Sequence, residues 1–241
     1  LHVHGESVNI RPRIALVLAL SLAATAYVPA IDSWFVKDDL LLLLGANTES
    51  VESFSSPWLG GFYRPLARTL FGLQFAIFGF LSWPYHVVSI TIHLACCLFV
   101  FTCARAYGAA QPTALAAMLI FGLHPGATET VAWISGQMSL VASCGMLATL
   151  AIVLRVSGYG YNRLYVPLAG VTTAISCLCY ETGALTPLFC SVALLGMGSK
   201  RSIRASYPVI LTSVAVVLIY LLVRAGLTGA LAGPYSLHIL A

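Results

Sequence analysis

The chain has 241 residues, of which 59% are hydrophobic and 8% are charged, and its mean hydropathy is +0.92. A soluble domain carries about a quarter charged residues, so this composition excludes a soluble globular protein and indicates an integral membrane protein. The net charge of +4 comes from basic residues scattered between apolar runs. That scatter excludes nucleic acid as a partner, because nucleic-acid binding needs a clustered basic face.

The first apolar segment runs from Ile14 to Ala30 and is long enough to cross a bilayer. Arg11 and Arg13 precede it. Because basic residues favour the cytoplasmic side of a membrane, we predict that residues 1–13 are cytoplasmic and that the chain then emerges on the outer face.

Residues 32–84 form a predicted outer loop that holds five of the eight acidic residues. Lys37 to Leu44 has the length of a short helix at the membrane interface. The apolar run 65–81 is interrupted by Arg68 and Gln74, so it either crosses the membrane or lies flat on the outer surface. We favour the flat arrangement, because it places Arg105 at the cytoplasmic end of the next segment.

Six further apolar segments follow, at 85–104, 113–123, 138–154, 165–179, 184–198 and 207–223. The sequence therefore predicts an all-α integral membrane protein with about seven transmembrane helices and interfacial helices in the first outer loop. We expect one membrane domain, with a helical bundle over residues 85–225 and an outer tail over 226–241.

Several ionisable side chains then fall on the outer face. Asp38 and Asp39 are either a favourable helix start, a general base, or carboxylates that bind a divalent metal. Arg64, after Tyr63, is either a topology anchor or a group that binds a lipid phosphate. Seven cysteines are present, but their spacing matches no zinc motif, and we assign no metal ligands.

Ionisable residues beside apolar spans are costly unless they are paired or face a cavity. On this basis we place three more side chains at the outer site: His124, Glu129 and Glu181. His86 and His93, a heptad apart, are interpreted as helix-packing groups.

The order of the motifs carries a family resemblance. Asp38-Asp39, Tyr63-Arg64-Pro65-Leu66, His124-Pro125 followed by Glu129 and Trp133-Ile134-Ser135-Gly136, and then Glu181 resemble the GT-C membrane glycosyltransferases. The similarity is strongest to the tetratricopeptide-linked protein O-mannosyltransferase-like branch, and it runs from about Asp32 to Arg224. The string HP-x3-E-x3-W-x-SG is its most specific part.

The resemblance implies an inverting transfer from a polyprenyl-phosphate-linked sugar, with Asp39 or Asp38 as the catalytic carboxylate. It also implies a substrate- and lipid-phosphate-binding set of Arg64, Tyr63, His124, Glu129, Trp133 and Glu181. Membrane lipids and the lipid-linked sugar are the expected partners. The expected location is the bacterial cytoplasmic membrane, with the active site on the periplasmic face.

The chain departs from the family pattern at three positions. Gln137 and Ser139 stand where an arginine and an acidic residue are usual, and Tyr180 stands where a lysine is usual. These changes leave a second hypothesis open, in which the chain is a catalytically inactive structural or accessory subunit of a larger membrane complex.

Overall fold

The computed structural model describes residues 10–46, 50–197 and 200–229, and every regular element in these ranges is helical. The α-helices are α1 (Ile10–Thr25), α2 (Asp39–Leu44), α3 (Ser50–Ser55), α4 (Pro65–Phe78), α5 (Trp83–Ala106), α6 (Gln111–Gly122), α7 (Ala127–Ala132), α8 (Gln137–Tyr159), α9 (Tyr165–Cys179), α10 (Thr186–Gly196) and α11 (Lys200–Thr228). Short 3₁₀ helices cover η1 (Val28–Asp32), η2 (Leu59–Gly61), η3 (Ile134–Gly136) and η4 (Glu181–Leu185).

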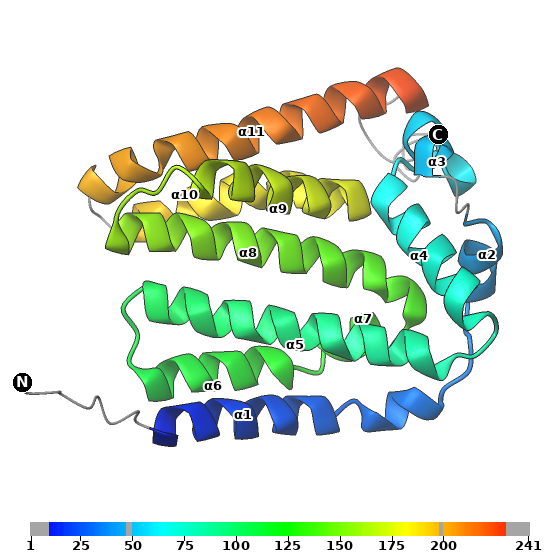
Figure 1. Cartoon of the computed structure of the whole chain (residues 1–241), viewed down its shortest axis with the longest axis horizontal. Coiled ribbons are helices and arrows are strands. Elements are labelled where there is room, and N and C mark those ends of the chain that lie inside the picture. The colour runs from blue at the N-terminus through cyan, green and yellow to red at the C-terminus, as the bar shows by residue number, and fades with distance from the viewer. Residues whose placement is uncertain (1–9, 47–49, 198–199, 230–241) are drawn as a thin grey trace, which may run out of the picture.

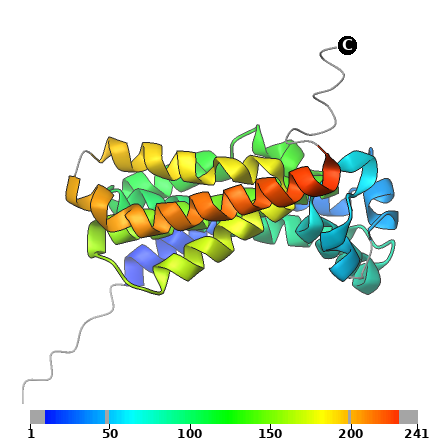
Figure 2. The same ribbon diagram turned by 90° about the horizontal axis from the view of Figure 1, so that it is seen from above.

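The longer helices lie side by side as a bundle, and α2, α3 and α4 lie at one end of it (Figure 1). A view turned by 90° keeps these three helices at the same end, next to the last turns of α11 (Figure 2). Helix α4 crosses the end of the bundle at a steep angle to α5 and α8 (Figure 1).

All seven predicted spans form helices, but only four segments in the described ranges are long and apolar enough to cross a membrane. These are Arg13–Asp32, Trp83–Ala106, Ile134–Gly158 and Ile203–Thr228. Helices α6, α9 and α10 have 12, 15 and 11 residues, which at 1.5 Å per residue is less than the thickness of a hydrocarbon core. The integral membrane class is thus confirmed, whereas the count of seven spans stays a prediction.

Charge divides between the two ends of the bundle. All six acidic residues in the described ranges lie at the end occupied by α2–α4, in or beside the short helices there. The opposite end carries exposed arginines: Arg13, Arg105, Arg155, Arg163 and Arg204. The residues predicted to gather on one face therefore do lie at one end. Residues 1–9 and 230–241, which hold most of the predicted cytoplasmic start and outer tail, lie outside the described residues.

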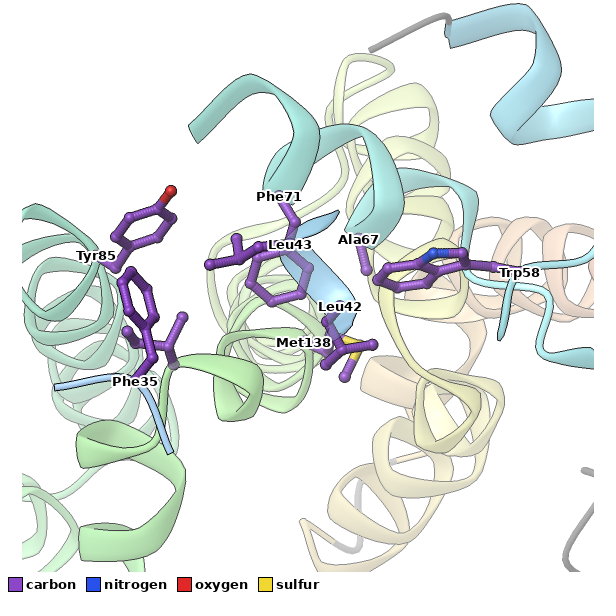
Figure 3. Packing of buried hydrophobic residues seen from close by; sticks show 9 residues of the cluster. Phe35, Leu42, Leu43, Trp58, Ala67, Phe71, Tyr85 and Met138 are labelled. Atoms are coloured by element: carbon purple, nitrogen blue, oxygen red, sulfur yellow. The ribbon is translucent and has the colours of Figure 1, made fainter. Parts of the chain in front are cut away.

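One apolar cluster attaches the first loop to the bundle. Phe35, Leu43, Phe71 and Tyr85 are buried together, and Met138 from α8 joins them (Figure 3). Phe35 and Tyr85 meet edge to face with their ring centroids 5.5 Å apart. The whole cluster packs the acidic loop against α4, α5 and α8, so the carboxylates of the loop are held in place.

Hydroxyl groups join the bundle helices α8, α9 and α11. Thr149 on α8 lies 2.7 Å from the Thr172 hydroxyl, and Thr173 donates to Ser213 on α11 at 3.1 Å. Ser176 donates to the carbonyl of Ala142 at 2.6 Å. Such interhelical hydrogen bonds and small residues replace the hydrophobic driving force that helices lack inside a membrane.

Candidate functional site at the acidic end

The two adjacent carboxylates of the first loop point to different environments. Asp39, the first residue of α2, is 1% exposed. Asp38 is exposed, and within the described part of the chain its side chain makes no capping hydrogen bond. Of the two predicted catalytic carboxylates, Asp38 is therefore the one that a substrate can reach.

Both carboxylate oxygens of Asp39 accept hydrogen bonds from other residues of the chain. One carboxylate oxygen accepts the backbone N–H of Val36 at 2.9 Å, and the other accepts the N–H of Ser135 at 2.8 Å as well as the Ser135 hydroxyl. Ser135 lies in η3 of the Trp133-Ile134-Ser135-Gly136 string. Asp39 thus connects the first loop to that string across 96 residues of sequence, and it holds Asp38 in position.

The close packing around position 136 requires a glycine there. A Cβ atom at this position would lie 2.4 Å from the carbonyl oxygen of Thr130 in α7. Any side chain would push α7 away from η3. The close approach is what brings Glu129 and Trp133 to the same side of the loop as Lys37.

A buried ionic cluster lies between the first loop and the ends of α9 and α11. The Arg64 guanidinium donates to both oxygens of Glu181, with distances of 2.8 to 3.0 Å. Arg224 on α11 approaches the same carboxylate at 3.8 Å. Side-chain exposures are 10% for Arg64, 22% for Glu181 and 4% for Arg224. Two cations share one anion, so the cluster carries an excess positive charge.

Aromatic rings enclose the Arg64 guanidinium. Its central carbon lies 4.2 Å from the ring centroid of Phe62 and 4.3 Å from that of Tyr180. Such stacking favours the planar guanidinium. Tyr180, where the family pattern has a lysine, thus serves as a stacking partner for Arg64, and a lysine there would add a third cation to the cluster.

An apolar groove of about 140 Å³ lies between α9 and α11, and Val223, the residue before Arg224, is part of its lining. Tyr63 and Tyr220 line it, and the Tyr220 hydroxyl donates to the Tyr63 carbonyl at 3.4 Å. Tyr63 is itself buried, and burial raises the pKa of its phenol above the ordinary value. Its hydroxyl donates to the carbonyl of Phe54 at 3.3 Å, so Tyr63 positions the loop beside Arg64.

Glu129 belongs to a second, exposed ionic site. Its carboxylate lies 2.7 Å from the Lys37 ammonium, and the two side chains are 69% and 58% exposed. The same ammonium lies 4.2 Å from the ring centroid of Trp133. An adjacent pocket of about 260 Å³ is lined by these three side chains together with Trp34.

His124 lies at the same end but faces a different space. Its Nδ1 accepts the backbone N–H of Gly126 at 3.0 Å, and the ring lines an apolar cavity of about 720 Å³ between α5, α6, α7 and α8. His93 lines this cavity too, and its Nε2 lies 3.0 Å from the carbonyl oxygen of Gly122. His86 is equally buried, with Nε2 3.1 Å from the Ser33 carbonyl oxygen. Both residues of the His86 and His93 pair are packing groups, as the sequence predicts.

Gln137, the second departure from the family pattern, is fully buried. Its oxygen accepts from the amide of Gln74 on α4 at 2.9 Å, and its own amide donates to the Tyr85 carbonyl at 2.8 Å. This neutral pair joins α4 to α8. It also explains why the interruption of the apolar run 65–81 by Gln74 is tolerated. Ser139, the third departure, is half-buried.

The described residues offer few side chains that could bind a metal ion together. Within the described ranges no three histidine, cysteine, aspartate or glutamate side chains come together. All seven cysteines are free, and six of them are buried. Asp38 and Asp39 do not form a joint ligand pair, because Asp39 turns into the core.

Two charged residues of the site are not predicted from the sequence. The sequence places Lys37 only at the start of an interfacial helix, and Arg224 only at the end of the family resemblance. For Arg224 a signal exists, because an arginine near the end of an apolar segment needs a partner or a cavity. For Lys37 the sequence holds no comparable signal.

Comparison with known proteins agrees with the resemblance. The chain is 30% identical over 210 residues to the protein O-mannosyl-transferase Tmtc2 of Drosophila melanogaster, which covers 77% of this chain and 22% of that protein. It is 27% identical over 187 residues to Tmtc1 of the same species, covering 71% of this chain and 22% of the relative. Human protein O-mannosyl-transferase TMTC3 is 26% identical over 160 residues, and the match covers 57% of this chain and 17% of that protein.

No family model matches the chain, and no solved structure matches it. The chain spans about a fifth of the length of the Drosophila relatives. All three relatives come from animals, and the bacterial location stays a prediction. The homologues of this membrane protein are protein O-mannosyl-transferases of the Tmtc kind, each several times longer than the chain itself.

Proposed function

We propose that this chain is a glycosyltransferase-like membrane protein that uses a polyprenyl-phosphate-linked sugar at the membrane face occupied by its acidic end. The observation that carries the proposal is the buried cluster of Arg64, Glu181 and Arg224 with its excess positive charge. The chain neighbours of the two arginines, Tyr63 and Val223, line an apolar groove.

A lipid phosphate matches this cluster in charge and in shape. The Arg224 Nε is buried and has no hydrogen-bond partner in the described part of the chain. Arg224 shares the single anion Glu181 with Arg64, and an excess of buried positive charge is costly; a phosphate oxygen at the Nε position relieves this cost through a charge-assisted hydrogen bond. The prenyl chain would then follow the groove between α9 and α11, where Tyr220 and Tyr63 lie.

Asp38 supplies the proposed general base. It is the exposed carboxylate of the pair, and Asp39 holds its loop against η3. A carboxylate in this position removes the proton from an acceptor hydroxyl while that oxygen attacks the sugar carbon, and the polyprenyl phosphate departs with the electrons of the broken bond. The name of the relatives, protein O-mannosyl-transferase, suggests mannose as the sugar and a protein hydroxyl as the acceptor.

The charge distribution supports the orientation. Basic residues favour the cytoplasmic side, and five exposed arginines lie at the end opposite Asp38. We therefore place the acidic end on the outer face. Helix α4, across that end, then lies at the interface rather than across the bilayer.

A second function has its own observation. The Arg64 guanidinium is already bound on both sides, by Glu181 and by two aromatic rings, and the arginine expected at position 137 is a neutral, buried glutamine. Both features suit a catalytically inactive subunit that keeps the fold and packs against other membrane chains.

Transfer in reconstituted vesicles tests the proposal. The full chain is incorporated into vesicles with polyprenyl-phosphate-[3H]mannose and a Ser/Thr-containing peptide, and label on the peptide is counted. We expect transfer by the unchanged chain and a loss of about 10²- to 10⁴-fold in Asp38→Asn. Asp32→Asn, the same chemical change at an exposed site outside the cluster, is the matched control and retains transfer.

Two results would contradict the proposal in different ways. If Asp38→Asn transfers as well as the unchanged chain, Asp38 is not the base, although the chain is a transferase. If the unchanged chain transfers no label although it is folded and binds the donor, and if it co-purifies stoichiometrically with another membrane chain, the chain is the accessory subunit.

A further inference from the structure

The pocket beside Lys37 and Glu129 is not involved in the transfer step proposed above. It lies between residues 33–37 of the first loop and α7, and its volume is about 260 Å³. Its walls combine two indole rings, from Trp34 and Trp133, with one ammonium and one carboxylate. Trp34 is 61% exposed, so one of the two rings is open to a ligand.

The ionic pair in this pocket contributes little to folding. Lys37 and Glu129 are 58% and 69% exposed, and pairs of this kind add little stability because water already solvates both charges. Fold stability therefore does not account for a lysine and a glutamate joined at 2.7 Å across 92 residues of sequence.

The backbone at Lys37 carries a cost as well. Its φ is +53°, and within the described ranges it is the one non-glycine residue with positive φ. A lysine disfavours this left-handed conformation, which occurs most often in glycine and asparagine. Here the conformation places the ammonium over the Trp133 ring and against Glu129. Backbone strain of this kind concentrates where a ligand is bound.

The chemistry of the walls selects the ligand class. The ammonium donates hydrogen bonds and the carboxylate accepts them, and a vicinal diol supplies both an acceptor and a donor. An indole face packs against the C–H face of a pyranose ring. The two charges cancel, so the pocket favours a neutral ligand over a phosphate, which the Arg64–Glu181–Arg224 cluster suits better.

We propose that this pocket, formed by Trp34, Lys37, Glu129 and Trp133, is a glycosyl-binding subsite that takes one neutral pyranose ring with vicinal hydroxyls. The inference rests on the proposed function. It adds the residues that hold the sugar itself, either the sugar of the lipid-linked donor or a sugar already present on the acceptor.

Saturation-transfer NMR on the full chain in detergent micelles tests the subsite. The probes are methyl α-mannopyranoside and, as a control, tetrahydropyran, which has the ring without the hydroxyls. We expect the mannoside to bind with a Kd on the order of 1 mM and tetrahydropyran to give no signal. Glu129→Gln and Lys37→Met should each weaken binding at least fivefold, because each removes half of the diol contact, whereas the Asp32→Asn control should bind as the unchanged chain does.

Competition identifies the source of the sugar. Displacement of the mannoside by a short-chain polyprenyl-phosphate mannose assigns the pocket to the donor, and displacement by a mannosylated peptide assigns it to the acceptor. Either result supports the subsite. Equal binding by the unchanged chain and Glu129→Gln, no mannoside binding at all, or displacement by an unglycosylated peptide would overturn it.

The vesicle assay separates this proposal from the previous one. Transfer of label by a chain that binds no mannoside overturns the subsite and leaves the proposed function standing. Mannoside binding that depends on Glu129, in a chain that transfers nothing, keeps the subsite and removes the proposed function. Circular dichroism of each variant confirms that helix content is unchanged, as expected for substitutions at exposed side chains.

Discussion

The two ionic sites at the acidic end differ in burial and in charge balance. Arg64, Glu181 and Arg224 are largely buried and hold two cations against one anion, whereas Lys37 and Glu129 are exposed and neutral together. Removing the partner of a buried ion lowers the folding stability strongly, but removing one member of an exposed pair changes it very little. The first site therefore contributes to folding and, in the function proposed above, to anion binding, whereas the only role that we propose for the second site is ligand recognition.

The largest predicted effect comes from the buried site. In Glu181→Gln the Arg64 and Arg224 guanidinium groups lose their shared anion, and we expect the free energy of unfolding to fall by about 3 kcal/mol. Denaturation of the purified protein in detergent, followed by circular dichroism, measures it. The double variant Arg64→Met/Glu181→Met should recover part of the loss, and an unchanged midpoint in Glu181→Gln would contradict the role of the cluster.

A smaller loss is expected when the buried carboxylate of the first loop is changed. Asp39→Asn places an amide opposite the N–H groups of Val36 and Ser135, and we expect a cost of about 2 kcal/mol. The same denaturation experiment measures it. Asp38→Asn, at the exposed neighbour, serves as the comparison and should leave stability unaltered. Equal losses in the two variants would mean that Asp38 also has a structural task.

The neutral pair of Gln74 and Gln137 should behave differently from both ionic sites. Gln137→Leu leaves the buried Gln74 amide with only its long 3.5 Å hydrogen bond to the Leu70 carbonyl, at a cost of about 1–2 kcal/mol. Replacing both glutamines by leucine removes this poorly satisfied amide. Since the Tyr85 carbonyl still accepts from Ser89 at 3.2 Å, the double variant should unfold near the unchanged midpoint. A double variant less stable than Gln137→Leu would show that the two amides do not act as a pair.

The smallest effect on folding, and the clearest pH dependence, is expected at Glu129. Lys37 lowers the pKa of this carboxyl through a hydrogen bond and charge attraction. A lowered pKa means that the pairing is complete above the ordinary pKa of a glutamate and is lost as pH falls through the lowered one. Mannoside binding should therefore weaken only in that acidic range, while helix content stays constant. In Lys37→Met the Glu129 pKa should rise toward its ordinary value, which NMR titration of the carboxyl would detect.

Much of the fold is predictable from local sequence. The apolar segments 85–104, 138–154 and 207–223 lie within α5, α8 and α11, because the hydrophobicity and length of a span are properties of the segment alone. The separation of acidic and basic residues to opposite ends follows from the same alternation. The segments predicted at 165–179 and 113–123 also match α9 and α6 closely, but these helices and α10 are shorter than a span, so the count of seven spans stays a prediction.

The sequence by itself thus determined the membrane class, the positions of the helices and the end at which the ionisable residues meet. Only the tertiary structure decided that Asp39 is buried while Asp38 is open, and that Arg64 binds Glu181. It likewise decided that Lys37 reaches Glu129. The reason is physical: these contacts join residues 92 to 117 positions apart, and they depend on how far each helix is rotated and displaced against its neighbours, which hydrophobic pattern along one segment does not specify.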